Sequence, residues 1–168
     1  MVTSDLYSEL VRDGEKYGSK FQDHLLEQYK LYVEMADKIS SRRASANEFF
    51  LTINTLLLSG LSLTSGLRPT GTNLVLPIFA AIAGISFCVV WIQTVRTYRT
   101  LNGVKFDLIG KVESRLPATM YATEWRVLSA RGDTGHYRAL SDVEKWVPVV
   151  FMLLYFFYAI TVVLLIAG

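Results

Sequence analysis

A series of small hydroxyl-bearing residues runs along one apolar stretch of the chain at helical spacing. Thr52, Thr55, Ser59 and Ser62 follow one another at intervals of three or four residues, and the same series reaches Glu48 in the N-terminal direction. Residues at this spacing share one face of an α-helix. Polar groups can line a wet path through a membrane, and rings of carboxylates favour cations at its mouth. The pattern therefore suggests a pore lining that ends in Glu48.

The same residues also fit ordinary packing between membrane helices. Small side chains let two helices approach closely in a bilayer, and Ser or Thr can bond across the contact. Asn54 lies beside the series and needs a partner inside hydrocarbon, either on another helix or along a path. An apolar seam at Phe50, Ile53 and Leu57 lies roughly 200° away on the helical wheel. We therefore expect this helix to have two different neighbours, with its polar face covered by other helices or by sister copies.

Three apolar runs without Asp, Glu, Lys or Arg set the class of the protein. They are Phe49–Leu67, Leu74–Val95 and Val147–Ala167, with 19, 22 and 21 residues. As helices they are each about 28–33 Å long, which matches a hydrocarbon core of about 30 Å. Because that layer holds no water, the backbone must satisfy its own hydrogen bonds, which favours helices. The sequence predicts three transmembrane helices.

Nearly all Lys and Arg residues lie in segments that would share one side of the membrane if the three runs span it. Of the 17 Lys and Arg residues, only Arg68 lies between the first two runs, and the others precede Phe49 or fall within 96–146. The positive-inside rule then places the N-terminus and segment 96–146 in the cytoplasm, and Gly168 outside.

Three residues at the ends of the runs are expected to anchor the protein at the membrane interface. Arg42 and Arg43 precede the first run, and Trp146 immediately precedes the third. Arginine stems lie along apolar surface while their charged heads reach water, and Trp favours the headgroup level. Anionic lipid headgroups are the alternative ligands of the two arginines.

Helical periodicity continues beyond two of the runs. Before the first run, apolar residues alternate at spacings of four and three from Leu25 to Ile39, which predicts one long helix over about residues 20–66. A similar pattern continues after the second run up to Pro117. Because 68–73 is a turn sequence, the two helices should form a hairpin. We expect their extensions to pair as an antiparallel cytosolic stalk.

The remainder of the chain should connect this stalk to the third span. A short helix is expected within 118–127, and Ser141 with Glu144 forms a capping box that predicts a helix start at Ser141. Pro148 should kink that helix. Bulky residues surround the third span, including Tyr155, so we expect it to face lipid.

The chain carries no recognisable catalytic arrangement. His24 and His136 are isolated, and Cys88 lies in the middle of the second run, where buried packing is its expected role. The 17 basic residues are interleaved with 15 acidic ones, which does not resemble a nucleic-acid-binding surface. We expect no enzymatic activity, no cofactor, no metal and no nucleic-acid partner.

Several stretches resemble a known family of membrane proteins. The strings Leu25–Arg43, Ala46–Thr55, Glu124–Arg126 and Val143–Pro148 resemble the small bacterial integral membrane proteins of the RipA-like family. The resemblance implies a bacterial inner-membrane protein that assembles into a ring, named in that family as an octamer. The helix–two-span–helix core is also similar to SLATT effector domains, for which pores are proposed; this chain differs by adding a third span.

Together these observations predict an all-α membrane protein with three transmembrane helices and a cytosolic antiparallel helical stalk that extends spans one and two. Its expected partners are the lipid bilayer and further copies of itself. The functional hypothesis is a channel or pore-like homo-oligomer whose first span faces the central axis. The alternative is a non-conducting scaffold whose stalk recruits a cytosolic protein. The predicted divisions are a lead-in (1–19), a cytosolic helix (20–46), the first span (47–67), the second span (74–95), a cytosolic helix (96–116), a connecting segment (117–146) and the third span (147–167).

Overall fold

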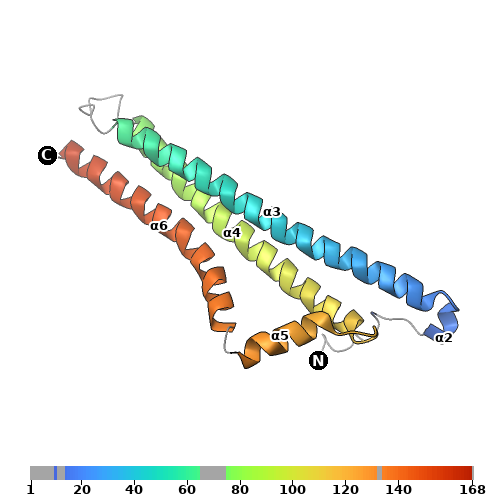
Figure 1. Ribbon diagram of the computed structural model, residues 1–168. Helices are drawn as coiled ribbons and strands as arrows, with labels where there is room; N and C mark the ends of the chain where they lie inside the picture. The colour runs from blue at the N-terminus through green and yellow to red at the C-terminus, as the bar shows by residue number, and fades with distance from the viewer. Residues whose placement is uncertain (1–9, 11–13, 65–74, 132–133, 168) are drawn as a thin grey trace, which may run out of the picture. The chain divides into compact units, whose positions relative to one another are not determined.

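Every regular element in the described part of the chain is an α-helix. The computed structural model describes residue 10 and residues 14–64, 75–131 and 134–167. The all-α class is therefore confirmed for these residues. The helices, shown in Figure 1, are α2 (Gly14–Tyr17), α3 (Phe21–Thr64), α4 (Val75–Glu113), α5 (Met120–Ala130) and α6 (Thr134–Ala167).

The two long helices α3 and α4 run without interruption, as the sequence predicts. α3 has 44 residues and α4 has 39. Between Phe21 and Ser59 the chain has neither Gly nor Pro, so nothing breaks the helical hydrogen-bond ladder. Gly18, with a φ of 101°, ends α2 in a left-handed conformation and turns the chain into α3.

Within the part of the chain that the structure describes, two helical segments are long and apolar enough to cross a membrane, namely Pro77–Glu113 and Val143–Leu164. α3 is not one of them within the described residues. The hydroxyl residues and Asn54 lower the hydropathy of its C-terminal half, and residues 65–67 of the predicted first span lie outside the described part. The predicted turn at 68–73 also lies outside it.

The chain divides into two compact units. Unit 1 contains Met1–Ser41 with Tyr98–Tyr137, and unit 2 contains Arg42–Thr97 with Arg138–Gly168. In unit 1 the N-terminal part of α3 pairs with the C-terminal part of α4. Leu25, Ala36 and Ile109 are buried there. The pairing is antiparallel, because Tyr29 bonds to Glu113 whereas Ser40 bonds to Asn102.

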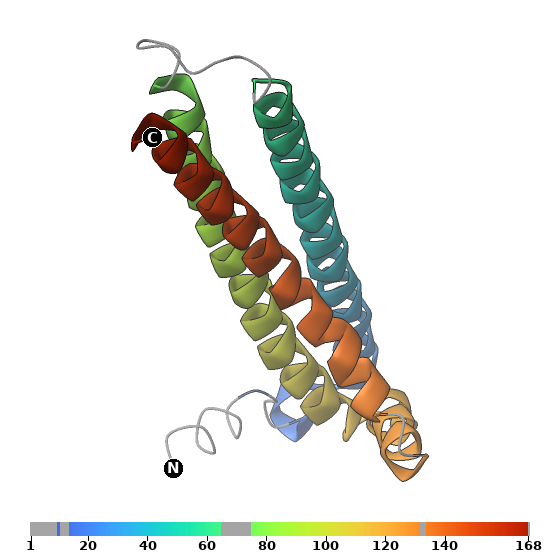
Figure 2. The same cartoon turned by 90° about the vertical axis from the view of Figure 1, so that its left-hand side faces the viewer.

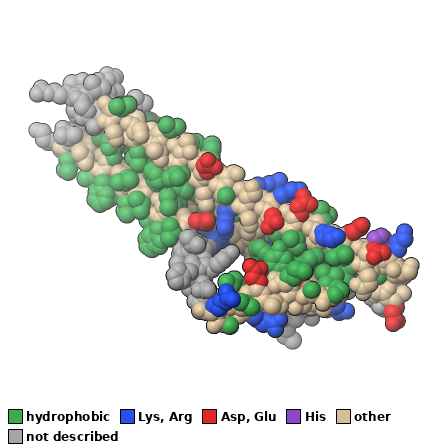
Figure 3. All heavy atoms as spheres, viewed as in Figure 1, with side chains coloured by type: hydrophobic (Ala, Val, Ile, Leu, Met, Phe, Trp, Pro, Cys, Tyr) green, Lys and Arg blue, Asp and Glu red, His purple; other side chains and the backbone are tan. Residues whose placement is uncertain are grey.

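In unit 2 the helices α3, α4 and α6 share one core. Leu61, Ala81, Cys88 and Tyr155 form one buried cluster, and Phe50, Trp91 and Val95 form a second. Figure 2 shows the C-terminal part of α6 alongside the first half of α4. Hydrophobic side chains are exposed over α6 (Figure 3), among them Leu153, Phe156, Phe157, Val163 and Leu164.

Two predictions about α6 are wrong. The helix begins at Thr134 rather than Ser141, so Ser141 lies inside the helix and does not cap it. Tyr155 does not face lipid, because its side chain is fully buried. Pro148 is inside the helix as predicted, and Figure 1 shows α6 bending in its N-terminal part. Proline lacks the N–H that would bond to the carbonyl four residues earlier, which weakens the helix at this point.

Candidate functional site

One side of α3 packs against the other helices of unit 2, and we call it the packing face. Its buried members are Phe50, Asn54 and Leu61. Phe50 packs with Trp91 of α4, and Leu61 packs in the cluster that contains Tyr155 of α6. These contacts fix which way the helix is turned in unit 2.

The opposite side of α3 carries the hydroxyl series found in the sequence, and we call it the hydroxyl face. At 100° per residue its centre lies roughly 150° from that of the packing face. Its members are all exposed: Glu48, Thr52, Thr55, Ser59 and Ser62.

Three of the four hydroxyl groups of this face, those of Thr55, Ser59 and Ser62, donate to carbonyls of their own helix. Thr55 Oγ1 donates to the Leu51 carbonyl at 2.8 Å, and Ser59 Oγ donates to the Thr55 carbonyl at 2.8 Å. Ser62 Oγ donates to the Leu58 carbonyl at 2.9 Å. Each of these three hydroxyl protons is therefore satisfied inside the helix, while the oxygen lone pairs remain at the surface as acceptors. The face can lie in a membrane at little cost and can still accept hydrogen bonds.

Asn54 was a candidate for this polar series, but the structure places it on the packing face. Its side chain is fully buried, and its Nδ2 donates to the Phe50 carbonyl at 2.8 Å. Cys88 Sγ of α4 donates to Asn54 Oδ1 at 3.3 Å, and the Tyr155 hydroxyl of α6 donates to the Asn54 carbonyl at 3.2 Å. Asn54 therefore joins three helices and does not belong to the exposed face.

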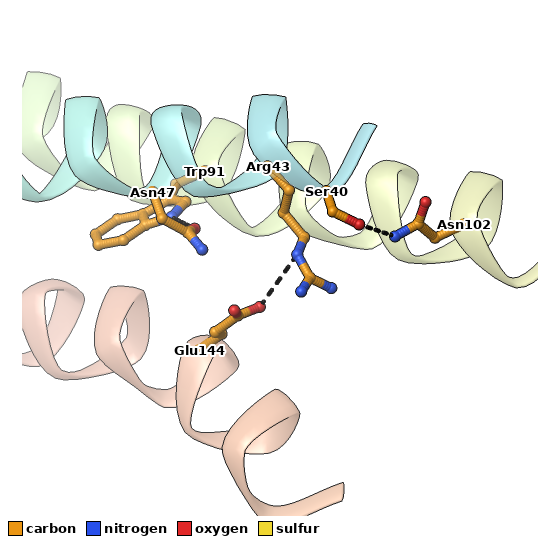
Figure 4. Close-up of polar contacts among 6 residues, drawn as sticks. All are labelled: Ser40, Arg43, Asn47, Trp91, Asn102 and Glu144. Atoms are coloured by element: carbon orange, nitrogen blue, oxygen red, sulfur yellow. Dashed lines mark hydrogen bonds and ion pairs between the residues drawn. The ribbon is translucent and has the colours of Figure 1, made fainter. Parts of the chain in front are cut away.

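A second polar contact, about two turns before Asn54, holds α3 against α4. Trp91 Nε1 donates to Asn47 Oδ1 at 2.7 Å (Figure 4). The Trp91 ring also stacks on Phe50, with ring centroids 5.8 Å apart and planes 14° apart. A buried indole N–H needs an acceptor, and Asn47 supplies it. The two asparagines, seven residues apart, therefore fix the rotation of α3 about its axis.

At Gly84, α4 makes a tight contact with Tyr155 of α6. A side-chain carbon at this position would overlap the aromatic ring of Tyr155. The absence of a side chain at Gly84 therefore makes room for this ring. This contact allows the Tyr155 hydroxyl to reach past α4 to the backbone of α3.

The predicted interface anchors lie in different surroundings. Arg42 and Trp146 are exposed, with Trp146 at 66% of its full accessibility. Arg43 is half-buried, and its Nε lies 3.7 Å from Glu144 Oε2 of α6 (Figure 4). Arg43 therefore links α3 to the start of the apolar part of α6.

Unit 1 contains a buried carboxylate in the last residue of α4, and it accepts hydrogen bonds from the start of α5. Glu113 is fully buried. Its Oε1 accepts hydrogen bonds from the Tyr29 hydroxyl at 3.2 Å and the Tyr121 backbone N–H at 2.9 Å, and its Oε2 accepts from the Ala122 N–H at 3.1 Å. A carboxylate at a helix N-terminus satisfies unpaired N–H groups and complements the helix dipole. Burial, and next the charge of Glu113, raise the pKa of Tyr29 to about 12.

Sequence reasoning missed three of the residues that build these contacts: Trp91, Tyr155 and Glu113. Each has a polar group within an otherwise apolar helical seam. That signal shows that a partner is needed, but it does not identify the partner. The partners lie 44 positions away for Trp91, 101 for Tyr155 and 84 for Glu113. Among the residues that the structure describes, no group of three or more His, Cys, Asp or Glu side chains is placed to hold a metal ion.

The described residues form long apolar helices with an exposed polar face on α3, which is the geometry of a helical membrane protein, and a comparison with known families agrees with this class. The family model of the octameric membrane protein family (8xMP) matches residues 26–165, which is most of the chain. No curated protein and no solved structure matches the chain. The matched region includes most of α3, all of α4 and α5, and nearly all of α6. The chain belongs to the octameric membrane protein family.

Proposed function

We propose that this protein is the subunit of a channel-like homo-oligomer in which the hydroxyl face of α3 lines a central path. The observation that carries the proposal is that this face is exposed in the protomer and lies opposite the packing face. Sister copies can pack closely against such small side chains, and water can bond to their hydroxyl oxygens, which remain acceptors. The octameric assembly in the family name supports self-association.

The proposed topology has three spans, with the N-terminus and residues 96–146 in the cytoplasm and the C-terminus outside a bacterial inner membrane. The distribution of Lys and Arg supports this orientation. In this arrangement the paired parts of α3 and α4 in unit 1 form the cytosolic stalk. The likeness to RipA-like proteins and SLATT effector domains is part of the same proposal.

The lining would act through hydroxyl oxygens and one carboxylate per copy. The oxygen lone pairs of Thr55, Ser59 and Ser62 can accept from water or coordinate a cation weakly, because their protons are held by backbone carbonyls. Glu48 lies at the cytosolic end of the face, and copies of it would form a ring of carboxylates. Such a ring attracts cations and repels anions. The expected cargo is therefore a small cation.

The direct test is ion flux into liposomes that contain the purified protein. We expect cation flux from the wild type, a loss of cation over anion preference in Glu48→Gln, and a loss of flux in Ser59→Leu, because leucine fills the path. Thr161→Leu is the matched control, since Thr161 is an exposed, back-bonded hydroxyl on α6. The proposal fails if the assembled wild type conducts nothing, or if Thr161→Leu has the same effect as Ser59→Leu.

The alternative is a non-conducting scaffold whose unit 1 binds a cytosolic protein, and one feature favours it. None of the residues of α5 is buried, and Met120, Trp125 and Val127 are exposed at 71, 51 and 42%. Apolar side chains of this size at an aqueous surface are typical of a protein contact. The scaffold hypothesis predicts intact oligomers without flux, together with a function in cells that Trp125→Ala abolishes. A normal phenotype for Trp125→Ala would contradict it.

A further inference from the structure

A cavity of about 410 Å³ lies on unit 2 between α4 and α6. Its lining combines charged and apolar side chains. Among its lining residues are Ile92, Val95 and Arg96 of α4, and Glu144, Lys145 and Pro148 of α6. Neither the hydroxyl face nor the packing face of α3 contributes to this lining.

The cavity lies where the apolar segments of both helices end. On α4, Arg96 is the first charged residue after the uncharged stretch 75–95. On α6, Lys145 is the last charged residue before the uncharged stretch 146–167. Trp146 also lines the cavity and is 66% exposed, as is typical of an aromatic residue at the headgroup level. In a membrane the charged lining residues would therefore lie at the level of the phosphates, and the apolar ones at the level of the first carbons of the acyl chains.

The charges around the cavity favour an anion. Arg96 and Lys145 contribute two positive charges to the lining, and Glu144 contributes one negative charge. Glu144 is paired with Arg43, whose Nε lies 3.7 Å from Glu144 Oε2 (Figure 4). This oxygen is buried, and Arg43 offsets part of the carboxylate's charge. Among the described side chains that line the cavity, two cations and one carboxylate leave a net charge of +1.

We propose that this cavity binds the headgroup of an anionic phospholipid. Arg96 and Lys145 interact with the phosphate, and Ile92, Val95 and Pro148 contact the start of the acyl chain. Basic pockets between membrane helices on the cytoplasmic side are suited to such headgroups, and charge-assisted hydrogen bonds to phosphate are strong. The inference requires membrane insertion but does not depend on whether the assembly conducts ions.

The test is lipid binding by the purified oligomer in detergent, measured by native mass spectrometry. The probes are phosphatidylglycerol and phosphatidylcholine with identical acyl chains. We expect phosphatidylglycerol to bind preferentially, and each of Arg96→Gln and Lys145→Gln to lower that preference about fivefold, because a basic residue at the headgroup level contributes about that factor. The charge-retaining variants Arg96→Lys and Lys145→Arg should keep the preference, which separates lost charge from lost folding.

Arg42→Gln is the matched control, because it removes an exposed interface arginine that does not line the cavity. An equal loss of preference in Arg42→Gln would mean that general surface charge is responsible, and the proposal would be wrong. An unchanged preference in Arg96→Gln and Lys145→Gln would also overturn it. Glycerol phosphate is the third probe: if it competes as strongly as the lipid, the cavity is a site for soluble phosphates and the lipid assignment is wrong.

Discussion

Single residues in unit 2 decide how closely the three helices approach one another. At Gly84 the absence of a side chain makes room for the ring of Tyr155, which passes over α4 to bond the backbone of α3. Asn54 adds a bond to Cys88, and Asn47 adds one to Trp91. Interhelical hydrogen bonds in a membrane are each worth about 0.6 kcal/mol or somewhat more, so the rotation of α3 rests on several small contributions.

Gly84→Ala should destabilise the protein by about 1–3 kcal/mol, because the added methyl group must displace the Tyr155 ring in a packed core. Chemical unfolding in detergent measures this change. Gly103→Ala is the control, because Gly103 lies in the same helix with open space around it. It should stabilise α4 by about 0.5–1 kcal/mol through helix propensity alone. Equal effects of the two variants would show that Gly84 has no special contact.

Glu113→Gln should loosen the start of α5. The amide keeps one acceptor but loses the charge that strengthens the bonds to Tyr121 and Ala122, at a cost of about 1–2 kcal/mol. Hydrogen exchange of the α5 amides measures the effect, and exchange should be faster in Glu113→Gln. Glu124→Gln, which changes an exposed carboxylate of α5, should leave exchange unchanged. Equal protection in Glu113→Gln and the wild type would contradict the capping role.

At the scale of the elements, hydrophobic periodicity predicted the long helices well and their ends poorly. α3 could be predicted from Leu25 onward because its seam repeats at helical spacing without Gly or Pro. The start of α6 could not, because Ser141 and Glu144 form a capping box by sequence while residues 134–140 are helical as well. A capping box stabilises a helix end, but it does not stop a helix from beginning earlier when the preceding residues tolerate helical geometry.

The two faces of α3 were only partly predictable, because the helical repeat does not show which face is covered by other helices. The spacing of Thr52, Thr55 and Ser59 showed that they share a side of the helix, and this required only the helical repeat. Whether that side meets α4 or remains open depends on partners far along the chain, such as Cys88 and Tyr155. Tyr155 was wrongly predicted to face lipid, because the size of a side chain alone does not distinguish a buried ring from an exposed one.

The number of spans determines on which side of the membrane the chain ends. Two helical segments among the described residues qualify as spans by length and composition. If α3 supplies the third, the C-terminus lies outside the cytoplasm when the N-terminus lies inside. A C-terminal alkaline phosphatase fusion should then be active, and a C-terminal green fluorescent protein fusion should be dark. The opposite pattern would show an even number of spans or an inverted orientation.

For the whole molecule, the central claim is that the hydroxyl face of α3 meets sister copies. Disulfide cross-linking in native membranes, in a Cys88→Ser background, tests it most directly. Ser59→Cys should give cross-linked dimers and higher species. Leu61→Cys, buried in the protomer, and Phe157→Cys, exposed on α6, should remain monomeric. Cross-links at Phe157→Cys with none at Ser59→Cys would show that α3 is turned away from the assembly and would contradict the account.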